Sequence, residues 1–126
     1  MFKILDIAGS AMMAQSKRLN VIASNLANVD SVSSATGEVY KPKHVVFEEK
    51  SMGVHVKEIY ERDDALLEYN PKHLLADAQG YIKKPNINPI EEMTDMISAS
   101  RSYQMNVEII QTTKQLINQT LKIGEN

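Results

Sequence analysis

Small and apolar residues recur at alternating intervals of three and four along the first part of the chain. The series runs Leu5, Ala8, Met12, Gln15, Leu19, Ile22, Leu26 and Val29, and Gln15 is its one polar member. This spacing is typical of a helix that packs one stripe of side chains against a partner helix. We therefore predict a long helix within residues 1–31, about 40 Å in length at 1.5 Å per residue.

A second series with the same alternation closes the chain. It runs Met93, Met96, Ser100, Tyr103, Val107, Ile110, Lys114, Ile117 and Leu121. Pro89 suits the first turn of a helix, and Gly124 is a typical stop signal. The pattern predicts a second long helix within residues 86–126. We expect the helix or subunit interface to involve Leu5, Ala8, Met12, Leu19, Ile22, Leu26, Met93, Met96, Tyr103, Val107, Ile110, Ile117 and Leu121.

Residues 32–85 have a different character. Residues 39–47 and 53–60 are rich in β-branched and aromatic side chains, which favour strands, and turn residues separate them. We predict a small middle portion, either a hairpin or a three-stranded sheet. The predicted fold class is mainly α, with this β-containing portion inserted between two long helices that pack antiparallel as a coiled-coil-like core.

Charged residues are concentrated in the middle of the sequence. Residues 38–92 carry 19 of the 30 Lys, Arg, Asp and Glu residues, so the two predicted helices hold few charges. Their outer positions carry Ser, Thr, Asn and Gln instead. A neutral polar face can be removed from water at lower cost than a charged one. This pattern favours helices that pack on several sides.

The composition argues against several functions. The chain lacks cysteine, and its three histidines are too scattered to suggest a metal site. Its five glycines form no phosphate-binding loop, and no catalytic constellation is apparent. A net charge of −2 gives no support for nucleic-acid binding, and no segment is apolar enough to span a membrane. We expect no cofactor. We also expect no cleaved signal peptide, because the charged Asp6 lies in the segment that would have to be the apolar region of such a peptide.

Three stretches of the sequence carry distinctive motifs. The first leads from Asp6 into the segment Ala23-Ser-Asn-Leu-Ala-Asn, and the second spans residues 76–87. The third is Glu92-Met93 followed by Ala99-Ser-Arg-Ser-Tyr-Gln-Met-Asn. Together they resemble the bacterial flagellar axial family of rod and hook subunits. The resemblance covers nearly the whole chain, and its polar motif residues are Asn25, Asn28, Arg101 and Asn106.

The resemblance implies a structural subunit of the flagellar basal body. Such a protein would be exported through the flagellar type III apparatus without a cleaved signal and would assemble with copies of itself and other rod subunits. The assembly would be an open helical tube that crosses the periplasm and transmits torque from the motor to the hook. Asn25 and Asn28 would satisfy backbone groups at a helix end or across a subunit boundary.

Two other functions remain as alternatives. A soluble cytoplasmic helical dimer, acting as a secretion chaperone or adaptor, would use the same heptads, although the low charge of the helices counts against it. An enzyme that cleaves cell-wall sugars through a carboxylate pair is a weaker alternative, because the chain has no length left for a further domain.

Overall fold

Two long helices and two small sheets make up the protein in a computed structural model that describes residues 2–125. Helix α1 spans Phe2–Ala27 and helix α2 spans Pro89–Glu125. The strands between them are β1 (Ser33–Ser34), β2 (Lys43–Lys50), β3 (Gly53–Glu61), β4 (Leu66–Tyr69) and β5 (Tyr81–Lys84). The predicted fold class is confirmed, since two packed terminal helices enclose an antiparallel β portion.

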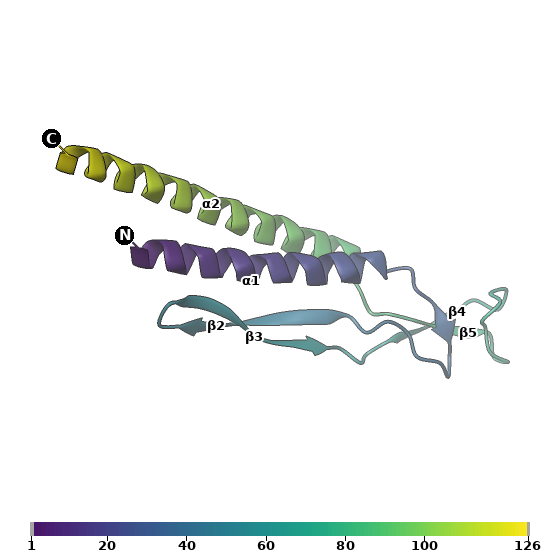
Figure 1. Ribbon diagram of the computed structural model, residues 1–126. Coiled ribbons are helices and arrows are strands. Elements are labelled where there is room, and N and C mark those ends of the chain that lie inside the picture. The colour runs from purple at the N-terminus through teal and green to yellow at the C-terminus, as the bar shows by residue number, and fades with distance from the viewer. Residues whose placement is uncertain (1, 126) are drawn as a thin grey trace.

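The elements lie in three layers along most of the molecule. Helix α1 is the middle layer, with α2 on one side and the β2–β3 hairpin on the other (Figure 1). The two helices run antiparallel, so that the N- and C-terminal ends lie at the same end of the molecule (Figure 1). Because α1 is covered on two sides, it contains most of the buried apolar residues, namely Ala8, Ala14 and Ile22.

The middle portion forms two separate sheets. Strands β2 and β3 pair antiparallel as a hairpin, with a register shift between Val46 and Phe47. Strands β1, β5 and β4 form a second sheet in that order, at the end of the molecule away from the two termini (Figure 1). The sequence predicted a hairpin or a three-stranded sheet. The two predicted strand segments form the β2–β3 hairpin, whereas the three-stranded sheet is made of strands that the sequence did not predict. The proposed segment boundaries at residues 31 and 85 stay a prediction, and residues 1 and 126 lie outside the described residues.

Local sequence explains where α2 begins. Asn88 accepts hydrogen bonds at its Oδ1 from the backbone N–H groups of Ile90 (3.1 Å) and Glu91 (3.4 Å), as an N-cap residue does. Pro89 occupies the first turn, where its missing N–H costs nothing. Glu91 and Glu92 then place negative charge at the positive end of the helix dipole.

A chain of side-chain contacts fixes the middle portion ahead of α2. Asp64 accepts hydrogen bonds from Arg62 and, at 3.2 Å, from Asn86, which joins the end of β3 to the segment before α2. The hydrogen bond from Arg62 lowers the pKa of Asp64 from its ordinary value. The whole contact is exposed to solvent, so it orients the chain more than it stabilises it.

The hairpin is attached to α1 at its tip. Gly53 has a φ of +127° and is buried against Ser10, and the backbone N–H of Val54 donates to Ser10 Oγ at 3.0 Å. Ser10 in turn donates to the carbonyl of Ile7 at 2.7 Å. A side chain at position 53 would collide with Ser10 and the α1 backbone.

We predict that Gly53→Ala destabilises the protein by about 1–3 kcal/mol, because the new methyl group meets both a positive φ and the Ser10 contact. Urea unfolding followed by circular dichroism measures the change. Gly124→Ala is the matched control, since a Cβ there meets no atom within 4 Å. Equal midpoints for the two variants would show that the hairpin tip is not seated on α1.

Candidate functional site

The side-chain amide of Asn25 connects three elements of the fold. Its Oδ1 accepts hydrogen bonds from the Tyr40 hydroxyl at 2.8 Å and from the Lys43 backbone N–H at 2.9 Å. Its Nδ2 donates to the Lys43 carbonyl at 2.8 Å and to Glu92 Oε2 at 3.3 Å. Four hydrogen bonds are all that one amide can make. Asn25, which is 1% exposed, therefore joins the last turns of α1 to the start of β2 and the first turns of α2.

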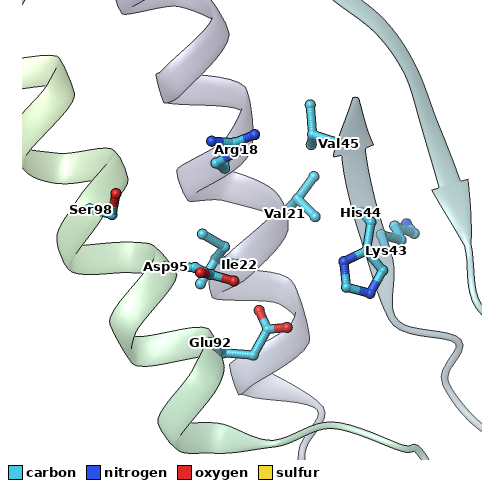
Figure 2. A pocket seen from close by; sticks show the side chains of 9 residues that line it. All are labelled: Arg18, Val21, Ile22, Lys43, His44, Val45, Glu92, Asp95 and Ser98. Carbon is cyan, nitrogen blue, oxygen red and sulfur yellow. The ribbon is translucent and has the colours of Figure 1, made fainter. Parts of the chain in front are cut away.

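Glu92 forms the α2 side of this junction and is only 7% exposed. It lies beside an open pocket of about 230 Å³ between α1, α2 and β2. Figure 2 shows Arg18 and Ile22 entering this pocket from α1, His44 from β2, and Asp95 beside Glu92 from α2. The Arg18 guanidinium stacks on the Phe47 ring at 3.9 Å, which attaches the hairpin to α1.

Within residues 2–125, no group of three or more His, Asp or Glu side chains is placed to hold a metal ion. His44 stacks on Tyr60 with ring centroids 5.5 Å apart, so its ring packs within the hairpin. Neither helix of the described chain is long and apolar enough to cross a bilayer.

The remaining motif residues lie close to the helix backbones. Asn28 Nδ2 donates to the Ser24 carbonyl at 2.9 Å, and Ser31 Oγ donates to Asn28 Oδ1 at 3.1 Å, which closes the end of α1. Asn106 Nδ2 donates to the Ser102 carbonyl at 2.8 Å within α2, whereas Arg101 is exposed on α2. Asn25 and Asn28 thus serve contacts within one chain.

The residues predicted for an interface on α1 lie mostly inside the molecule. Ala8 and Ile22 are buried, and the half-buried members are Leu5, Met12, Leu19 and Leu26. Gln15 faces α2, where its amide donates to Ser102 Oγ at 3.2 Å.

The corresponding residues on α2 are divided between two faces. Tyr103, Val107, Ile110 and Ile117 are half-buried, whereas Met93, Met96 and Leu121 are exposed. The positions that α2 buries most are instead Glu92, Ala99 and Thr113, and Asn106 is half-buried on the same seven-residue spacing. The sequence analysis missed this series because its members are small or polar. A search for small or polar residues at seven-residue intervals would have found it.

Large apolar side chains remain exposed along both helices. On α1 they are Phe2, Ile4, Ile7 and Met13, and on α2 they are Ile90, Met93, Met96, Ile97, Met105, Ile109, Leu116, Leu121 and Ile123. Exposed apolar surface on this scale is typical of a protein that associates with others. The role of the predicted residues in contacts between subunits stays a prediction.

Comparisons with known proteins agree with this arrangement. Residues 5–35 match the family model described as "Flagella basal body rod protein", and residues 78–123 match "Flagellar basal body rod FlgEFG protein C-terminal". The two matches include most of α1 and α2. They define the chain as a structural protein of the flagellar basal body.

Relatives identify the branch of this class. The chain is 47% identical over 132 residues to the flagellar basal-body rod protein FlgC of Salmonella typhimurium, covering 99% of this chain and 98% of the relative. It is 48% identical to FlgC of Yersinia enterocolitica over the same shares of both chains. For FlgC of Aquifex aeolicus the identity is 40%, over 96% of this chain and 95% of the relative. The chain belongs to the FlgC family of flagellar basal-body rod proteins.

The family fixes the function at a coarse level. The chain is a structural subunit of the basal-body rod, where it assembles with other rod components. The chaperone and enzyme alternatives have no support in these comparisons, because the relatives are structural rod proteins.

We predict that Asn25→Asp destabilises the folded chain by about 3 kcal/mol or more at neutral pH, since it removes two donors and places a second carboxylate beside Glu92. The new carboxyl should have a raised folded-state pKa, so part of the lost stability should return as the pH falls through that pKa. Thermal unfolding between pH 4 and 8 measures this effect. The exposed Asn20→Asp is the control, and an equal effect at both positions would contradict the junction.

Proposed function

We propose that this subunit forms part of an open helical tube that crosses the periplasm and transmits torque from the motor to the hook. In such a tube, α1 and α2 bury their remaining apolar faces against copies of the chain and other rod subunits. A contact that repeats along an open array joins two different surfaces of each subunit, head to tail. The proposed contacts therefore join different faces of successive subunits.

The exposed apolar residues of the helices are the observation that carries this proposal. Met105 is 62% exposed and Leu121 is 61% exposed in a single chain, although both lie in regular helix. Among the neighbouring polar positions on α2, Gln104, Gln111 and Thr112 are uncharged, while the exposed Arg101 and Glu108 carry opposite charges. Apolar and neutral polar side chains on the same surface can be covered by another subunit without burying an unpaired charge.

We also propose that the chain is exported by the flagellar type III apparatus without cleavage of an N-terminal signal. Support comes from the first turns of α1, which are continuous with the packed helix and lead directly to the buried Ala8. Removing these turns would take away part of the surface on which α2 packs.

Met105→Glu tests the proposal, because it places a carboxylate at a helix position that is 62% exposed in the single chain. We predict an unchanged helix signal for the purified protein. Swimming speed should fall at least tenfold in cells that carry this variant as their single copy, since an unpaired charge in an interface costs several kcal/mol.

The control is Leu74→Glu, at a fully exposed loop position with 101% relative exposure. This variant should support normal swimming. Immunoblots of purified basal bodies show whether each variant reaches the rod. If cells with Met105→Glu build normal rods and swim normally, the helix faces are not the assembly surface.

A further inference from the structure

Gly9 lies within α1, and the chain itself gives no reason for a glycine there. A Cβ built at this position meets no atom within 4 Å. A glycine inside a helix costs roughly 0.5–1 kcal/mol compared with alanine. Gly53 has an evident purpose, since its missing side chain makes room for Ser10. The bare backbone at Gly9 instead faces open space, where another chain could approach closely.

An apolar groove surrounds Gly9. It lies between α1 and α2, has a volume of about 610 Å³, and is lined by Gly9, Met12, Met13, Ser16, Lys17, Tyr103 and Ile110. Met13 is 72% exposed at the rim of this groove. We call it the Gly9 groove.

The C-terminal part of α2 extends past α1. The hydrogen bonds from Asn25 to Glu92 and from Gln15 to Ser102 fix how the two antiparallel helices are aligned. In this alignment Phe2 lies opposite residues near 115. At 1.5 Å per residue, the ten residues from 116 to 125 therefore project about 15 Å beyond α1. Figure 1 shows the C-terminal end of α2 extending past the N-terminal end of α1. They expose Leu116, Leu121 and Ile123.

We propose that the projecting end of α2, residues 116–123, docks into the Gly9 groove of a second copy of this chain. This inference rests on the proposed assembly and adds the two surfaces that meet. One subunit offers an apolar helix end and the next offers an apolar groove, so the contact is heterologous and can repeat without closing. The absent side chain at Gly9 lets the incoming helix approach the α1 backbone.

Charge at the rim of the groove suits this occupant. Lys17 takes part in none of the three ion pairs among residues 2–125, and its position places a positive charge beside the groove. A helix C-terminus carries partial negative charge from its free carbonyl groups, and in the last turns of α2 the Glu125 carboxylate offsets the Lys122 ammonium group. The carbonyl groups at the incoming end of α2 would therefore bring partial negative charge towards Lys17.

Disulfide cross-linking tests this contact directly, because the sequence contains no cysteine. A variant with Met13→Cys and Leu121→Cys is expressed as the single copy, basal bodies are purified, and mild oxidation follows. Within one chain, residue 13 lies opposite residues near 104, so the two introduced thiols are about 25 Å apart along the helices and cannot bond. A bond between them must join two chains.

The proposal predicts a ladder of dimers, trimers and longer species on non-reducing gels, since each copy uses both surfaces. The pair Met13→Cys with Leu74→Cys should give no ladder. Adding Gly9→Leu to the first pair should reduce cross-linking at least tenfold, because the leucine fills the groove, while circular dichroism shows the helices intact.

Each other outcome overturns the proposal in a distinguishable way. If the chain is present in basal bodies but no ladder forms, the docking is wrong and the rod function stands. A bond from the thiol introduced by Met13→Cys to a different rod protein would show that the occupant is not a second copy. Absence of the unmodified chain from basal bodies would overturn the proposed function together with this contact.

Discussion

The fully bonded amide of Asn25 sets the arrangement on which the rest of the structure depends. By holding Lys43 and Glu92 at the same point of α1, it fixes both the hairpin and the register of α2. A buried amide that uses all four hydrogen-bonding sites costs little to bury, whereas an alternative register would leave it unsatisfied. That register makes α2 project beyond α1 and determines which apolar side chains remain outside.

Two of the three most buried residues of α2, Ala99 and Thr113, are small. Small side chains let the helix backbones approach, but they bury little apolar surface. The larger residues, such as Met105 and Ile109, are consequently left on the outer faces. A monomeric protein would pack these residues inward, whereas a rod subunit can use them to bind its neighbours. Under the proposed assembly, stability of the single chain and association into a rod use different faces of the same two helices.

The sequence was sufficient to predict both long helices, the β portion between them and the structural class. It could not predict the burial of α2 in detail. The seven-residue period was correct, but the small Ala99 is buried whereas the predicted Met96 is exposed. Strands β4 and β5 were missed, since turn residues at 70–71 and 78–80 dominate that segment. The partners of Asn25 lie 18 and 67 residues away in sequence, and local pattern carries no information about such distant contacts.

The central claim is that assembly covers the apolar faces of α1 and α2. Methionine oxidation footprinting tests it directly, because Met13, Met93 and Met105 are exposed on these helices in the single chain. Brief peroxide treatment of the purified chain and of intact basal bodies, followed by mass spectrometry, gives the oxidation rate at each position. The account predicts that all three methionines react at least tenfold more slowly in the basal body. Equal rates in the two samples would show that the helix faces stay open to solvent in the rod.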